Sequence, residues 1–277
     1  MSTCVPNFSI GPMRFDEYDQ CVDIAAAAFT INNPMVVHLG IPRELYKRLV
    51  VSDTPLKATV HSGLSLVARS EDDGKPLAFL FMKVADFNEL PADDIFDLHA
   101  GFQVTKDALE QLYDKALMAP LTGLCLGSVN AGKTLHCLMG GTFPDVDGTG
   151  LGKALRIHAI AHARARGFNT LLVEPCHGSS LHIWTAYCGG VVKAQIAWDA
   201  FRMKKPGALG EFPLRGVAGG LAIVEVVLAR SFWDATVFWP YYAYTLLAEY
   251  EASAAERKQK RAAQLALQST VAQKAPL

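Results

Sequence analysis

The sequence predicts an α/β fold in which one mixed sheet carries helices on both faces. Three observations lead to this prediction. Apolar runs of strand length alternate with amphipathic helical stretches through the second half of the chain. An Asp-Gly pair at residues 73–74 separates two apolar runs in the first half, which is typical of a β-hairpin. The 277 residues are 51% hydrophobic and 19% charged, a composition that can bury a full core.

The first half supplies helices around the hairpin. In chain order we expect a helix at 14–28, a loop at 29–42, a helix at 43–51, hairpin strands at 64–69 and 77–85, and a helix at 105–118. The first helix begins with acidic residues, which the helix dipole favours there. The last one lies in an insertion and is predicted because its apolar residues share one helical face: Leu109, Leu112, Tyr113, Ala116 and Leu117.

The second half alternates strands and helices. The expected strands are 134–143, 169–174, 191–201 and 221–229, and the expected helices are 150–166 and 179–188. Gly167 is a natural stop for the first of these helices. We therefore predict one domain at residues 8–230, followed at 231–277 by an aromatic segment and a helical tail.

Charge and cysteine usage limit the function classes. The formal net charge of -1 creates no global field that would attract nucleic acid or an anionic membrane. No apolar run is long enough for a membrane span, and the N-terminus lacks the pattern of a signal peptide. The six cysteines show no CxxC spacing and are typical of reduced thiols. We therefore expect a cytoplasmic protein without a membrane span or a nucleic-acid partner.

The most informative segment is TFPDVDGTGLGKAL at residues 142–155. A predicted strand ends there, glycines follow at 148, 150 and 152, and a helix begins at once. Glycine permits positive φ and close approach to a ligand. The start of a helix presents unpaired amides and the positive end of its dipole. A phosphate or pyrophosphate is therefore expected against residues 147–153.

Two common phosphate-binding motifs do not fit this segment. A Walker A loop needs Ser or Thr after Gly152-Lys153, where Ala154 stands, and a glycine where Asp147 stands. A dinucleotide fingerprint that starts at Gly148 needs glycine at position 153, which is lysine. Both motifs are excluded.

The segment resembles the central motif of GNAT acyltransferases, VxPxxR/QGxGxG/A. Aligned on Pro144, Thr142 takes the valine place and Asp147 the Arg/Gln place, so a carboxylate replaces a cation or an amide. The resemblance implies the GNAT fold with a splayed central sheet, and acetyl-CoA or another acyl-CoA as co-substrate with no metal. The residues that it assigns to the coenzyme are Gly141, Thr142, Asp147, Gly148, Thr149, Gly150, Leu151, Gly152 and Lys153.

Two further stretches are similar to arylalkylamine N-acetyltransferases. Residues 135–144 match the pattern LHxxxxGVxP, and residues 29–40 match FxxDEPLxxxLG. The resemblance implies N-acyl transfer, with acetyl the expected group, to a small-molecule amine rather than a protein. The alternatives are a longer acyl chain, a hydroxyl acceptor and a non-catalytic acyl-CoA-binding module.

The resemblance also suggests catalytic residues. His136 matches a histidine that passes protons from the amine in some arylalkylamine enzymes, although a core histidine is the alternative. Asn33 stands where the insect enzymes have a glutamate base, and Glu174, at a strand end, is a reserve base. Tyr187 lies one position from the tyrosine that protonates the thiolate in many GNATs. A bulge at Gly140-Gly141 would polarise the thioester carbonyl and splay the sheet.

Other candidates have simpler interpretations. His158 and His162 are four apart on a helix, but without an acidic partner we predict no metal site. Cys137 is interpreted as a buried, inert thiol rather than an acyl carrier. The aromatic run at 232–244 is expected to pack against the sheet edge, with an acceptor site, a homodimer contact or a contact with a membrane as alternatives.

Overall fold

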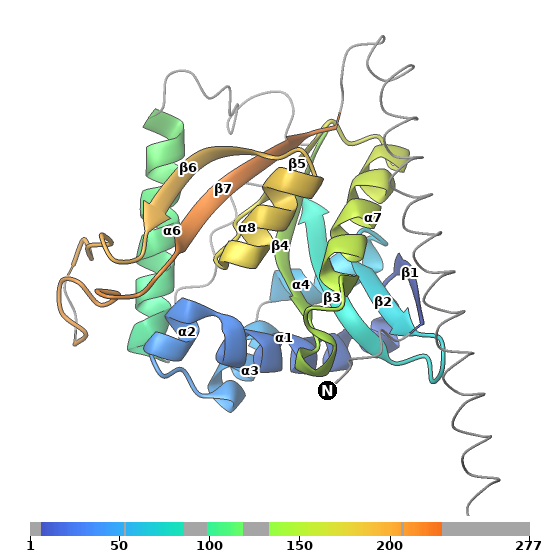
Figure 1. Ribbon diagram of the computed structural model, residues 1–277, viewed down its shortest axis with the longest axis horizontal. Coiled ribbons are helices and arrows are strands. Elements are labelled where there is room, and N and C mark those ends of the chain that lie inside the picture. The colour runs from blue at the N-terminus through green and yellow to red at the C-terminus, as the bar shows by residue number, and fades with distance from the viewer. Residues whose placement is uncertain (1–6, 53, 86–98, 119–132, 206–207, 229–277) are drawn as a thin grey trace, which may run out of the picture. The chain divides into compact units, whose positions relative to one another are not determined.

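A seven-stranded mixed sheet organises the chain (Figure 1), in the order β1-β2-β3-β4-β5-β7-β6. The computed structural model describes residues 7–52, 54–85, 99–118, 133–205 and 208–228. The strands are β1 (Phe8–Pro12), β2 (Leu66–Ser70), β3 (Pro76–Val84), β4 (Thr134–Thr142), β5 (Thr170–Val173), β6 (Val191–Ala197) and β7 (Gly220–Val227). β4 and β5 pair in parallel, and the other neighbours pair antiparallel. The prediction of a mixed sheet is confirmed.

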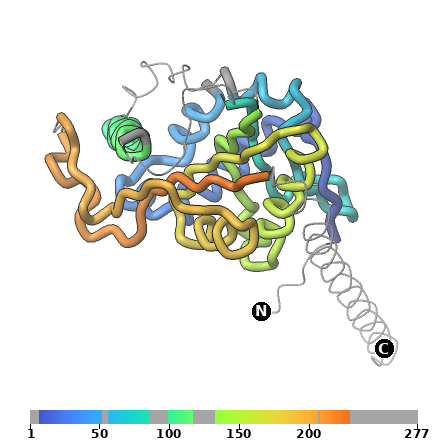
Figure 2. The backbone as a smooth tube through the Cα atoms, turned by 90° about the horizontal axis from the view of Figure 1, so that it is seen from above, coloured from blue at the N-terminus to red at the C-terminus, as the bar shows by residue number. Residues whose placement is uncertain are grey.

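Helices cover both faces of this sheet. They are α1 (Tyr18–Asn32), α2 (Pro34–His38), α3 (Arg43–Ser52), α4 (Thr54–His61), α6 (Ala100–Met118), α7 (Leu151–Ala165) and α8 (Gly178–His182), which a π-helical turn, η4 (Ile183–Tyr187), extends. α1 and α6 lie on one face, and α7 and α8 on the other (Figure 2). Successive side chains of β3 point to opposite faces of the sheet. Phe79 and Phe81 therefore pack in the core on one face, while Leu80 and Met82 pack in the core on the other.

The segment expected to be a loop, residues 29–42, is largely helical. α1 continues to Asn32, and α2 follows after a single residue, Asn33. The side chain of Asn33 accepts hydrogen bonds from the amides of Met35 and Val36, and Pro34 occupies the first helical position. The prediction of a loop is wrong here, because Asn33 and Pro34 start a helix. β1 and α4 were also not predicted.

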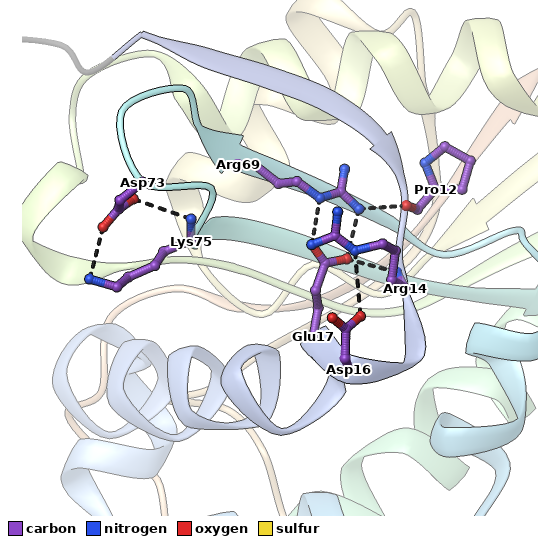
Figure 3. Close-up of polar contacts among 7 residues, drawn as sticks. All are labelled: Pro12, Arg14, Asp16, Glu17, Arg69, Asp73 and Lys75. Carbon is purple, nitrogen blue, oxygen red and sulfur yellow. Dashed lines mark hydrogen bonds and ion pairs between the residues drawn. The ribbon is translucent and has the colours of Figure 1, made fainter.

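A buried ionic cluster ties the start of the chain to the sheet (Figure 3). Glu17 is 2% exposed, and its carboxylate accepts from Arg69 Nε at 2.5 Å and Arg69 Nη2 at 2.7 Å. Arg14 completes the cluster, with its Nη2 2.9 Å from Glu17 Oε1. Arg69 Nη2 also donates to the Pro12 carbonyl at 2.7 Å. The beginning of α1 is therefore fixed against β2, well apart from the Asp73–Lys75 turn that Figure 3 also draws.

β4 and β5 stop pairing halfway along β4. Their last paired residues are Cys137 and Val173, while β4 remains paired with β3 as far as Thr142. The register between β3 and β4 skips Leu138, which is therefore the extra residue of a bulge. The predicted bulge at Gly140-Gly141 is wrong by two to three positions. Gly140 leaves room for the buried side chain of Leu80, which a Cβ at this position would force to shift.

The predicted aromatic segment and helical tail, residues 231–277, lie outside the described residues. Within the described ranges, no helix has the length and apolarity needed to cross a membrane. Residues 8–228 group as one compact unit.

Candidate active site

The loop after β4 leads the chain directly into α7. A single 3-10 turn at Pro144–Val146 is followed by Gly148 and Gly150, whose φ angles of 73° and 86° are left-handed. Gly150 is the N-cap of α7 and has no side chain that could cap the helix. The first bond of the helix runs from the Ala154 amide to the Gly150 carbonyl, at 3.0 Å. The amides of residues 151–153 precede that bond and are placed to bind an anion.

Gly152 lies close to two polar side chains in this first turn. A Cβ on Gly152 would lie 3.1 Å from Arg156 Nη1 and 3.1 Å from Thr142 Oγ1. Polar groups from β4 and from the second turn of α7 therefore converge on the space that a side chain would fill. These polar groups and the first-turn amides could hold the phosphate end of a coenzyme.

Asp147 makes its hydrogen bonds within the protein. Its carboxylate accepts from the Gly148 amide at 2.9 Å and from Asn32 Nδ2 at 3.4 Å. Its own amide donates to the Pro144 carbonyl at 3.2 Å. Thr149 also bonds within the loop, with Oγ1 donating to the Val146 carbonyl at 2.7 Å. The two residues shape the loop.

His136 and Glu174 meet at the point where β4 and β5 part. His136 pairs with Leu172 in the parallel register, and Glu174 lies two residues further along the chain, so the three side chains share one face of the sheet. His136 Nε2 lies 2.8 Å from Oε2 and 3.0 Å from Oε1 of Glu174. The two side chains are only 14% and 10% exposed. The pair is a shielded acid–base unit.

Tyr113, on α6, completes this cluster. Its hydroxyl donates to Oε1 of Glu174. Burial raises the pKa of Glu174, but the charge of His136 and the hydrogen bonds from His136 and Tyr113 outweigh it, so the pKa is lowered overall. Burial and the neighbouring carboxylate raise the pKa of Tyr113, which keeps its proton on the oxygen. Glu174 is therefore ionised at neutral pH and can stabilise a protonated imidazole.

Asn33 does not act as a substitute for a glutamate base. It is 5% exposed, and its oxygen caps α2. Its Nδ2 donates to the Sγ of Cys176 at 3.1 Å, just beyond the end of β5. Burial raises the pKa of Cys176 to about 11, so this thiol is neutral as well. Asn33 ties the junction of α1 and α2 to Cys176 without taking a proton.

Tyr187 and Lys153 contact each other on the opposite side of the sheet, at α7 and η4. Lys153 Nζ lies 4.7 Å from the centroid of the Tyr187 ring, and His182 packs edge-on against the same ring. Tyr187 is 41% exposed. Of the three predicted catalytic residues, His136 and Glu174 therefore contact each other. Tyr187 instead contacts Lys153 in the first turn of α7.

The other sequence candidates are partly or fully buried. His162 Nε2 bonds the Gly63 carbonyl at 3.1 Å, and burial lowers the pKa of both His158 and His162. Cys137 is 3% exposed, and burial raises its pKa to about 12. Among the described residues, no group of three His, Cys, Asp or Glu side chains could hold a metal ion.

Solved structures share this architecture. Arylalkylamine N-acetyltransferase 2 from Aedes aegypti superposes with a TM-score of 0.60 at 16% identity, over 80% of this chain and 100% of that one. A putative arylalkylamine N-acetyltransferase 7 from the same mosquito gives 0.61 at 14% identity, over 80% and 88%. The C-terminal condensation domain of Ebony, in complex with beta-alanyl-dopamine, gives 0.60 at 14% identity, over 79% and 98%.

The chain has the GNAT fold. No family model matches the sequence, and no curated protein matches it either. Within this GNAT fold, sequence reasoning found His136 and Glu174 separately but missed Tyr113, which bonds Glu174, and Arg156, which bonds the Gly152 carbonyl. Tyr113 was visible only as one apolar position of a predicted helix. Arg156 carried a signal that was overlooked, because it is a charged residue on the apolar face of α7.

Proposed function

We propose that the protein is an acyl-CoA-dependent N-acyltransferase that moves an acetyl group directly onto a small-molecule amine. The observation that carries the proposal is the His136–Glu174 pair, placed where β4 and β5 separate. The anion-binding first turn of α7 follows the far end of the same strand, β4. The fold that this chain shares with arylalkylamine N-acetyltransferases supports the same class of reaction.

The residues of the chain can perform the proton chemistry of such a transfer. An amine attacks only when neutral, and acetyl-CoA supplies the activated acyl group. His136 accepts the amine proton, and the ionised Glu174 stabilises the resulting imidazolium. Tyr113 holds Glu174 in place through its hydroxyl. The amide at the Leu138 bulge is our candidate to polarise the thioester carbonyl, in place of the predicted Gly140-Gly141. Tyr187 is retained as the proposed proton donor to the thiolate.

Coenzyme binding is tested by a matched pair of glycine variants at the two ends of α7. Gly150 and Gly167 have φ angles of 86° and 79°, and a Cβ at either position meets nothing within 4 Å. Exchange for glutamate therefore strains both positions alike, but only Gly150 lies at the anion site. Acetyl-CoA should raise the Tm of the wild type and of Gly167→Glu, but not that of Gly150→Glu. An equal shift in all three proteins would contradict the assigned site.

A further inference from the structure

Arg156 is a buried cation in the second turn of α7. It is 9% exposed, and Nη1 donates to the Gly152 carbonyl at 2.9 Å while Nη2 donates to Ser180 Oγ at 3.2 Å. Nε is buried and has no hydrogen-bond partner among the described residues. The guanidinium lies 5.7 Å from the Trp184 ring. In the described part of the chain, no carboxylate pairs with it.

A buried guanidinium without a counterion is costly for the fold. The ionisable groups that interact with Arg156 are the thiols of Cys137, Cys188 and Cys176. Burial raises the pKa of these thiols to about 12, 12 and 11, so they are neutral and cannot balance the charge. A binding partner that brings an anion would recover part of this cost.

The position of Arg156 indicates where the anion would bind. Long side chains on a helix point back toward its N-terminus, and Nη1 lies 3.1 Å from the place of a Cβ on Gly152. The guanidinium therefore lies beside the first turn, whose amides precede the first helical bond. Asp147, which occupies the place where the resembling motif has Arg or Gln, supplies no positive charge to this turn.

We propose that Arg156 is the cation of the donor site and binds the diphosphate of the acyl donor together with the first-turn amides of α7. This inference rests on the proposed function, because it takes the donor to be an acyl-CoA. It assigns the positive charge that Asp147 does not supply to a residue in the second turn of α7. It also implies that the free protein is less stable because of Arg156, and that the donor compensates.

The proposal is tested by two effects of one substitution, on the Tm of the free protein and on its affinity for CoA. Arg156→Leu removes the unpaired charge, so the Tm of the free protein should stay equal or rise. The same variant should bind CoA about tenfold or more weakly by calorimetry, while its affinity for pantetheine, which lacks the diphosphate, should not change. Arg156→Lys should keep most of the CoA affinity. Arg166→Leu, which removes an exposed charge near the other end of α7, should leave both affinities unchanged.

The other outcomes are distinct. Equal losses for CoA and pantetheine would place Arg156 against the pantetheine arm and overturn the proposal. Unchanged CoA affinity in Arg156→Leu would overturn it too, as would a Tm that falls together with CoA affinity, because Arg156 would then be structural. If Arg156→Leu fails to fold, equal CoA affinity in Arg156→Met decides against the proposal and a selective loss decides for it. A wild type that binds no CoA would overturn the proposed function itself.

Discussion

Exchanging Glu174 for glutamine removes the negative charge beside His136 while keeping the size of the side chain. The Tyr113 hydroxyl can still donate to the amide oxygen of the new residue. The amide nitrogen would then face His136 Nε2, which lies 2.8 Å from a carboxylate oxygen in the wild type. The imidazole would have to accept there instead of donate, and its protonated form would lose its partner.

The expected loss follows from the geometry of the pair. Two charges about 4 Å apart interact by about 4 kcal/mol at the effective dielectric that suits protein sites. Part of this is already offset by desolvation, because burial opposes the ionisation of Glu174. We expect about 3 kcal/mol to remain in the step that protonates His136, which corresponds to a loss of about a hundredfold in kcat/KM at neutral pH.

Steady-state kinetics with acetyl-CoA and an accepted amine provide the assay, over a pH range that spans the titration of an ordinary imidazole. The proposed base must be deprotonated to act, so kcat/KM of the wild type should rise with pH. Glu174→Gln should move this rise to lower pH, because the imidazolium loses its counterion, while its affinity for acetyl-CoA is retained. Glu225→Gln is the matched control, because Glu225 is 14% exposed and paired with Lys193 on the neighbouring strands. Wild-type rate and pH profile in Glu174→Gln would refute the acid–base role of the pair.

Three further changes probe the neighbours of the site. Tyr113→Phe should lower kcat by about tenfold or less without changing the affinity for acetyl-CoA, and an unchanged pH profile with full kcat would show that Tyr113 does not position Glu174. Asn33→Ala should cost about 1–2 kcal/mol in urea denaturation, because α2 loses its cap; an unchanged midpoint would argue against the cap. The pKa values of Cys137 and Cys176 are raised to about 12 and 11 from 9.0, so only the unfolded chain releases these protons just above pH 9. The free energy of unfolding should therefore fall there by up to about 1.4 kcal/mol per pH unit and thiol, and a flat profile would contradict this burial.

The sheet was predictable because its strands carry their own signals. The Asp-Gly turn and the apolar runs of β3, β4 and β7 mark strands whatever they pack against. α2 was missed because its start depends on one side chain, Asn33, that caps it. The position of the bulge was also missed, since the register of β4 against β3 depends on tertiary pairing rather than on local glycines.

The candidate site was only partly predictable for a similar reason. The proposed phosphate-binding loop is continuous in sequence, so glycine spacing alone was enough to predict it. His136 and Glu174 lie 38 residues apart, and only the parallel register of β4 and β5 brings them together. Tyr113 reaches the pair from the insertion, whose packing no local pattern specifies. That Nε of Arg156 has no hydrogen-bond partner among the described residues became apparent only when its surroundings were known.

Release of free CoA is the most direct measure of the proposed acyl transfer. Purified protein would be incubated with acetyl-CoA and a panel of aromatic, aliphatic and polyamine acceptors, with thiol release and product mass recorded together. The proposed function predicts CoA release with at least one amine, in equal amount to an N-acetylated product, and its loss in His136→Ala. Binding of acetyl-CoA without CoA release for any amine would contradict the enzyme assignment and identify an acyl-CoA-binding module instead.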